Sequence, residues 1–187
     1  RMLAYSSVAH AGYMLLAMPV MSGDSMFAIM IYLVMYLFMN LGAFFVVITV
    51  QNKTGGETFD DYKGLGWEMP MIGIVMTIFM VSLTGLPPTA GFIGKFYIFA
   101  SLIKGGNEFY WLVMIGGINS VISLFYYLRV VKVMYFEGES HEKIVQPPTV
   151  MAALLLATAI PTVLLGVYWT PIADWVQRSL VFFIQTL

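Results

Sequence analysis

One lysine interrupts a long apolar part of the sequence, directly after a break rich in glycine and proline. The segment 85–96 reads GLPPTAGFIGKF; residues 69–86 carry no charge, and Lys95 is the only charge in 89–103. An ionisable group at membrane depth costs about 2.5–3.5 kcal/mol on insertion scales, so it is a candidate for function. Because desolvation disfavours the ammonium form, such a lysine can take up and release a proton near neutral pH. We therefore expect Lys95 to transfer protons.

The break before this lysine favours an ion path. Proline removes backbone donors that lipid cannot replace, so irregular backbone at this depth must be buried in protein or line a wet cavity. Glycines beside the lysine permit close helix approach or a water-lined bend. The residues expected to form the break are Gly85, Pro87, Pro88, Gly91 and Gly94. The alternative is a lysine that snorkels to the interface, but Lys104 is about 13 Å away along a helix, which is far for snorkelling.

A histidine near the middle of the first apolar segment is the second candidate. His10 has Ser6 four residues before it and Tyr13 three residues after it, so all three share one helix face. Histidine titrates near neutral pH, and the stripe could pass protons or hold waters. The alternative is a histidine that only fixes helix packing. With only one other histidine in the sequence, His141, and no cysteine, we expect no metal site.

Other polar residues within the apolar runs suit structural roles better. Arg129 and Lys132 end a long apolar run and are expected to anchor its topology at a helix C-terminus. Four further residues are expected to bond neighbouring helices: Asn40, Asn119, Ser120 and Ser123. The sequence has no phosphate-cradling glycine loop, nucleophile elbow or dinucleotide fingerprint.

The composition places the chain in a bilayer. Of its 187 residues, 60% are hydrophobic and 10% are charged, against about 25% charged in soluble domains. The net charge of −1 predicts neither nucleic acid nor a polybasic lipid patch as a partner. The lack of cysteine excludes disulfides, thiolate metal sites and iron–sulfur ligation by this chain. Since the chain begins with Arg1, directly ahead of an apolar segment, we expect a fragment of a longer polypeptide.

The fold class expected is all-α, a polytopic bundle of about five crossings in a single membrane domain, 1–187. The crossings are predicted at about 3–21, 25–50, 69–103 (broken at 85–88), 109–136 and 149–168. Residues 171–187 form an amphipathic tail, predicted to lie at the interface.

Charge asymmetry decides whether 69–103 crosses once or twice. With one crossing, a single positive residue, Lys104, faces the other side. Its opposite side then holds Arg1, Lys53, Lys63, Arg129, Lys132 and Lys143. Two crossings would divide the charges almost evenly. The asymmetry favours one discontinuous, tilted helix with its break near the midplane, and cytoplasmic linkers at 51–66 and 137–148.

Three sequence blocks resemble the antiporter-like membrane subunits of respiratory complex I, the bacterial-type NADH–quinone oxidoreductase. They are RMLAYSSVAH at 1–10, GLPPTAGFIGKFYIF at 85–99 and SVISLFYYLRVVKVMYF at 120–136. Within the family, the proline pair, the lysine followed by Phe-Tyr, and the FYYLRVV run are most similar to subunit N. The resemblance covers essentially the whole chain.

That resemblance implies the C-terminal portion of a fourteen-helix subunit that translocates protons in the bacterial inner membrane. Lys95 would be the terminal lysine of a hydrophilic axis, and His10 would match a polar position of that axis. The partners would be other membrane subunits, especially neighbouring antiporter-like subunits, and lipids. This chain would bind no cofactor; NADH, FMN, iron–sulfur clusters and quinone would bind elsewhere in the complex.

Two other functions remain open at this point. A subunit of a multisubunit cation/proton antiporter or of a membrane-bound hydrogenase would share the broken helix and its lysine. A purely structural membrane scaffold would use the ionisable groups only to satisfy one another. A quinone site is less expected, because this part of the family does not meet the redox arm.

Overall fold

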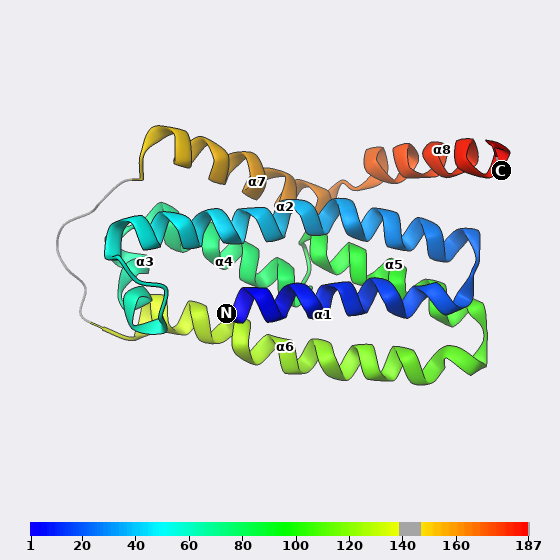
Figure 1. Cartoon of the computed structure of the whole chain (residues 1–187), viewed down its shortest axis with the longest axis horizontal. Helices are drawn as coiled ribbons and strands as arrows, with labels where there is room; N and C mark the ends of the chain where they lie inside the picture. The colour runs from blue at the N-terminus through cyan, green and yellow to red at the C-terminus, as the bar shows by residue number, and fades with distance from the viewer. Residues whose placement is uncertain (139–146, 187) are drawn as a thin grey trace.

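The long helices of the chain run along one common axis, and the short helices of Phe59–Glu68 lie at one end of the bundle (Figure 1). A computed structural model describes residues 1–138 and 147–186, and all regular secondary structure in those ranges is helical. The elements are α1 (Met2–Ala17), η1 (Met18–Val20), α2 (Gly23–Thr54), η2 (Phe59–Tyr62), α3 (Leu65–Glu68), α4 (Pro70–Thr84), α5 (Ala90–Gly105), η3 (Asn107–Phe109), α6 (Tyr110–Phe136), α7 (Thr149–Val167) and α8 (Thr170–Thr186). His141, Lys143 and Leu187 lie outside the described residues.

Helix α2 forms the centre of the bundle. It contacts α1, α4, α5, α7 and α8. A capping box between Ser22 and Ser25 begins it, and Gly55 ends it in the left-handed conformation. Its 32 residues span about 48 Å, more than the roughly 30 Å of a bilayer core. Side chains such as Ile31, Tyr32 and Met35 are fully buried, so α2 is the element against which the others are positioned.

Helices α4 and α5 follow one another along the bundle, separated by a non-helical stretch at 85–89 (Figure 1). Gly85, with a φ of +88°, ends α4, and its N–H donates to the carbonyls of Val81 and Ser82. Thr89 caps α5, and its hydroxyl donates to the Leu86 carbonyl at 2.7 Å. A hairpin would have laid the two helices side by side along their lengths. Their arrangement is that of one discontinuous helix, as the charge pattern predicted.

Three helical stretches in the described residues are long and apolar enough to cross a membrane alone: Gly23–Thr54, Asn107–Phe136 and Thr149–Val167. A fourth is counted if Phe59–Glu68 and Pro70–Thr84, bent by 118°, form one span. The predicted crossings at 3–21 and 69–103 instead consist of shorter helices. Helix α1 passes into η1 at Pro19, which lacks an amide donor, while α4 and α5 are the two parts of the broken unit.

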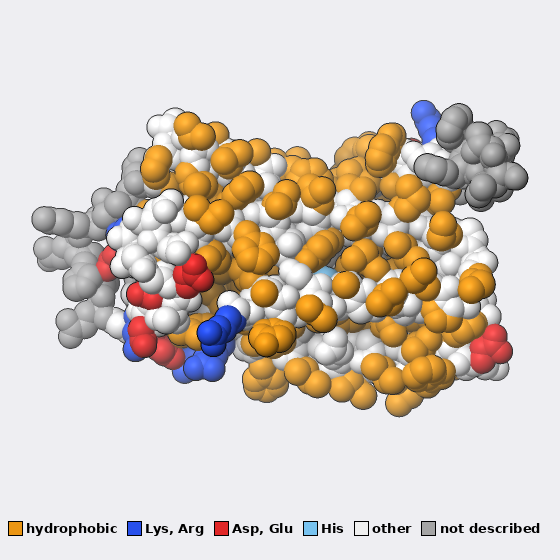
Figure 2. Space-filling view, viewed as in Figure 1, with side chains coloured by type: hydrophobic (Ala, Val, Ile, Leu, Met, Phe, Trp, Pro, Cys, Tyr) orange, Lys and Arg blue, Asp and Glu red, His pale blue; other side chains and the backbone are white. Residues whose placement is uncertain are grey.

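The C-terminal tail, predicted to be amphipathic, forms helix α8. Helix α8 contacts α2 and runs along the bundle rather than across its end (Figure 1). Figure 2 shows apolar side chains over the long side of the molecule, with charged side chains gathered towards its ends. The apolar exposure is greatest along α6, where Met114, Val121 and Phe125 are all more than 60% exposed. Such a surface suits lipid or neighbouring membrane helices.

Candidate proton-transfer site

The side chain of Lys95 binds the broken end of α4. It is 5% exposed, and its Nζ donates to the carbonyl oxygens of Thr84 at 2.7 Å and Leu83 at 3.2 Å. The last carbonyls of a helix have no intrahelical partners, and the helix dipole places partial negative charge there. The break therefore supplies the acceptors that a buried ammonium needs.

The space for this contact comes from the glycines of the break. A Cβ on Gly85 would lie 2.8 Å from Cδ of Lys95, and a Cβ on Gly94 would lie 2.7 Å from the ring of Tyr32. A Cβ on Gly91 would overlap the carbonyl oxygen of Ser82, whose hydroxyl accepts a hydrogen bond from the Gly91 N–H at 3.1 Å. The two half-helices approach each other through atoms that only glycine leaves free.

Gly91→Ala should separate the ends of α4 and α5, because the obstructing atom belongs to the backbone. We expect a loss of about 1–3 kcal/mol, the usual cost of overpacking a tight contact. Thermal unfolding of the purified full-length protein in detergent would measure it. Gly117→Ala on α6 is the matched control, because its Cβ meets nothing within 4 Å. Equal melting temperatures for the two variants would contradict the close approach.

His10 lies at the centre of a buried chain of hydroxyl groups. Its Nδ1 lies 2.6 Å from the Tyr32 hydroxyl on α2, and its Nε2 lies 3.1 Å from the Tyr127 hydroxyl on α6. The Tyr127 hydroxyl also bonds the hydroxyl of Ser6 on α1. All four side chains are at most 1% exposed. The ring of Tyr36 stacks on the imidazole with centroids 5.1 Å apart.

The hydrogen bonds around His10 must all run in one direction. A neutral imidazole has one donor nitrogen and one acceptor nitrogen. One of the two tyrosines must therefore donate to His10 while the other accepts from it. Exchanging the tautomer requires both hydroxyls to turn, as they would after a proton has passed along the chain. The group can thus relay a proton between α6 and α2.

Tyr13 lies between the histidine chain and the lysine. Lys95 Nζ stands 4.6 Å from the centroid of the Tyr13 ring, a cation–π contact. The Tyr13 hydroxyl lies 2.8 Å from the Ser120 hydroxyl and donates to the Gly116 carbonyl at 3.3 Å. A groove of about 510 Å³ includes both Lys95 and Ser120 in its lining. The structure thus brings Lys95, His10 and Tyr13 into one region, with Ser6 joined to it through Tyr127.

A family model described as NADH:quinone oxidoreductase/Mrp antiporter, transmembrane, matches residues 1–123. This chain belongs to that family. It is 52% identical over 181 residues to "NADH-quinone oxidoreductase subunit N 2" of Sorangium cellulosum, covering 96% of this chain and 36% of the relative. The chain therefore spans about a third of the length of the curated relatives that it matches.

Two solved structures of respiratory membrane complexes match the fold. One is the membrane-bound sulfane sulfur reductase, an archaeal respiratory membrane complex, with a TM-score of 0.84 and 27% identity over 95% of this chain and 36% of that chain. The other is respiratory complex I from Thermus thermophilus, with a TM-score of 0.74 and 28% identity over 92% of this chain and 38% of that chain. The predicted all-α membrane fold and family resemblance are confirmed.

Several members of the site in this antiporter-like chain were not predicted. Tyr32 and Tyr127 bind both nitrogens of His10, and backbone carbonyls of α4 bind Lys95. Ser120 of α6 bonds Tyr13 on the neighbouring helix α1, as predicted, but its place at the edge of the lysine groove was not predicted. In the sequence, Tyr32 and Tyr127 are visible only as tyrosines within apolar runs. The periodicity of one helix does not show which residue of another helix a side chain contacts.

The residues predicted to serve structure have such contacts in the antiporter-like fold. The guanidinium carbon of Arg129 lies 4.7 Å from the ring centroid of Phe59 in the linker, and Lys132 Nζ lies 3.2 Å from Oε1 of Glu137. The Ser7 hydroxyl of α1 lies 3.5 Å from the amide oxygen of Asn40 on α2, a contact between helices as predicted. The Ser123 hydroxyl instead donates to the Ser120 carbonyl within its own helix. Within the described ranges, no three His, Asp or Glu side chains gather as metal ligands.

Proposed function

We propose that this chain is the C-terminal part of a proton-translocating membrane subunit of a bacterial NADH–quinone oxidoreductase. The observation that carries the proposal is the buried Lys95, bound to the carbonyl end of a broken helix beside the chain of hydroxyls around His10. The relatives' names and the matches to respiratory complexes support it. Its partners would be other membrane subunits of the complex, in the inner membrane.

In this function, Lys95 takes up and releases the proton. The ammonium form is stabilised by the carbonyls of Leu83 and Thr84, whereas a neutral amine loses most of that attraction. A change of field at the break would therefore alter the proton affinity of the lysine. His10 and its two tyrosines would bring protons towards this region from α6 and α2. The redox cofactors would act elsewhere in the complex, whose electron transfer would supply the change of field.

NADH-driven proton uptake by inverted membrane vesicles containing the full-length protein tests the proposal. We expect uptake that requires NADH and quinone but no sodium gradient. The fold is shared with a sulfane sulfur reductase, and the family includes Mrp antiporters, so a cation/proton antiporter or hydrogenase subunit is the second candidate. Sodium/proton exchange in the same vesicles without NADH would favour that candidate and contradict ours.

Tyr127→Phe should slow proton translocation by at least about tenfold, because it removes the hydroxyl that joins Ser6 to His10. The variant leaves both partners buried without that bond, at a cost of about 1–3 kcal/mol. The initial rate of proton uptake per assembled complex measures the effect. Tyr110→Phe, on the exposed start of α6, is the control. A rate for Tyr127→Phe equal to that of the control would remove Tyr127 from the path.

A further inference from the structure

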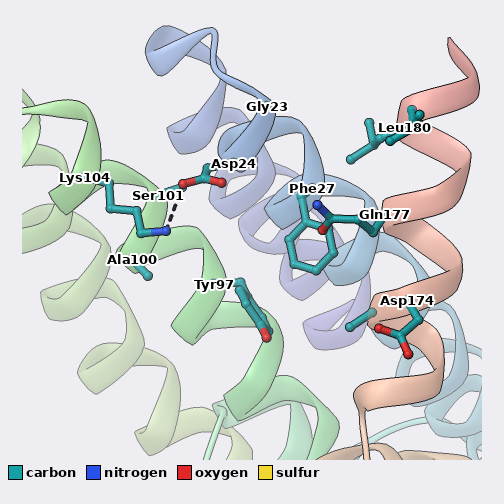
Figure 3. Close-up of a pocket in the computed structure, with 12 residues that line it drawn as sticks. Gly23, Asp24, Phe27, Tyr97, Ala100, Ser101, Lys104, Asp174, Gln177 and Leu180 are labelled. Carbon is teal, nitrogen blue, oxygen red and sulfur yellow. Dashed lines mark hydrogen bonds and ion pairs between the residues drawn. The ribbon is translucent and has the colours of Figure 1, made fainter. Parts of the chain in front are cut away.

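A second groove lies at the end of the bundle where α2 begins and α5 ends, and it shares Ala100 and Lys104 with the lining of the lysine groove. It has a volume of about 510 Å³ and is walled on its third side by α8 (Figure 3). Its floor is aromatic: Phe27 and Tyr97 meet edge to face with centroids 5.2 Å apart. The Trp169 indole donates to the Tyr97 hydroxyl at 3.1 Å, which fixes this ring. The groove is thus a shaped feature of the fold.

Charged groups stand on two facing walls of this groove. On one wall, Lys104 Nζ binds the Asp24 carboxylate at 2.9 Å, and both side chains are more than half exposed. On the other wall, Asp174 and Gln177 extend from α8 towards α2 and α5 (Figure 3). No described side chain bonds Asp174 or Gln177. A ligand that carries a cation and an anion a few ångströms apart would meet partners on both walls.

The depth of the groove is that of lipid headgroups. Lys104 lies fourteen residues after the start of α5 at Ala90, about 21 Å along the helix axis. With the break at the midplane, the hydrocarbon core ends about 15 Å from it. The wall formed by Lys104 and Asp24 then lies at the headgroup level, while Tyr97, about 10 Å along α5 from Ala90, lies at the start of the acyl chains.

We propose that this groove binds the headgroup of an ethanolamine phospholipid. The phosphate would take a free donor of the Lys104 ammonium, which has three. The primary ammonium of the lipid would donate to the carboxylate of Asp174 and the side-chain oxygen of Gln177, over the faces of Phe27 and Tyr97. The lipid would tie α8 to α2 and α5.

The charges of the groove decide between lipid classes. The lining contains two carboxylates and one ammonium, so a purely anionic headgroup such as phosphatidylglycerol is repelled. Arg178, one turn after Asp174, does not line the groove. Choline carries a cation but has no N–H to donate to a carboxylate. Of these three headgroups, only ethanolamine supplies both the charge and the donors.

Photolabelling of the assembled complex tests this proposal. The complex, in phosphatidylcholine/phosphatidylglycerol vesicles, is given a trace of phosphatidylethanolamine with a diazirine near the glycerol, and labelled peptides are mapped. We expect label on peptides of α5 and α8 around the groove. Asp174→Asn should reduce that label about tenfold, the effect of losing one charge-assisted hydrogen bond. Glu108→Gln, at the same end but outside the groove lining, should leave it unchanged.

Three results would overturn the proposal. One is equal labelling of Asp174→Asn and the unmodified protein. The second is labelling by phosphatidylglycerol or phosphatidylcholine analogues as strong as that by phosphatidylethanolamine. The last is an absence of label from α5 and α8. Because Asp174, the residue that the test replaces, does not line the lysine groove, none of these results bears on the proposed proton path.

Discussion

Lys95→Met should reduce NADH-driven proton translocation by at least about tenfold while the complex still assembles. Methionine retains most of the length and volume of the lysine stem, so packing against Gly85 and Tyr13 changes little. What it removes is the ammonium and its bonds to the carbonyls of Leu83 and Thr84. Those carbonyls end a helix in a protein interior, so some loss of thermal stability should accompany the loss of transport.

Lys95→Arg separates these two effects. A guanidinium can also donate to the carbonyls, but it hardly deprotonates at accessible pH. We expect this variant to recover stability but little or none of the proton translocation. The measurements are the melting temperature of the purified complex and the initial rate of proton uptake by vesicles. Transport by Lys95→Arg at the unmodified rate would show that Lys95 holds the break together without carrying a proton.

Substitutions of His10 should have the second-largest effect. His10→Leu fills the space but leaves the hydroxyls of Tyr32 and Tyr127 without their ring partner in a buried site. Each unsatisfied group costs about 1–3 kcal/mol, so the variant should unfold at a clearly lower temperature. Its proton translocation should also fall, because the chain of hydroxyls is interrupted at its centre.

His10→Gln distinguishes the relay from the packing role. The amide offers both a donor and an acceptor, so it can keep hydrogen bonds to the tyrosines, but it does not titrate. We expect the melting temperature of His10→Gln to be closer to that of the unmodified protein than the melting temperature of His10→Leu is. Its proton translocation should be reduced about as much as that of His10→Leu. The same thermal and uptake measurements apply. Full transport by His10→Gln would support the packing alternative, in which the histidine only joins three helices.

The sequence predicted the arrangement of this fold well because the strongest signals are local. Charge-free runs predicted the apolar helices, and the asymmetry between Lys104 and the other positive residues predicted one broken helix. The clustering of Ser6, His10 and Tyr13 on one face followed from helical spacing, and all three are buried. These inferences need only the helix period and the cost of charge in lipid.

The contacts between helices were beyond such reasoning. That the phenol of Tyr127 lies between Ser6 and His10 depends on the rotation of α6 relative to α1, which neither segment encodes alone. The groups that bind Lys95 are backbone carbonyls, which every residue has, so the residue types in the sequence do not reveal them. The polar residues of the tail predicted an amphipathic helix, but they did not show that its apolar side chains Val176 and Leu180 would be buried in the bundle.

If Lys95 and His10 carry protons and do more than satisfy their neighbours, replacing both must lower proton translocation even where the hydrogen bonds are kept. The double variant Lys95→Arg/His10→Gln tests it most directly, since both replacements keep hydrogen-bonding capacity and neither exchanges protons readily near neutral pH. The measurement is the number of protons translocated per electron in vesicles that contain equal amounts of assembled complex. We predict a lower ratio than that of the unmodified complex. An unchanged ratio in a fully assembled complex would contradict the account and leave this chain a structural scaffold.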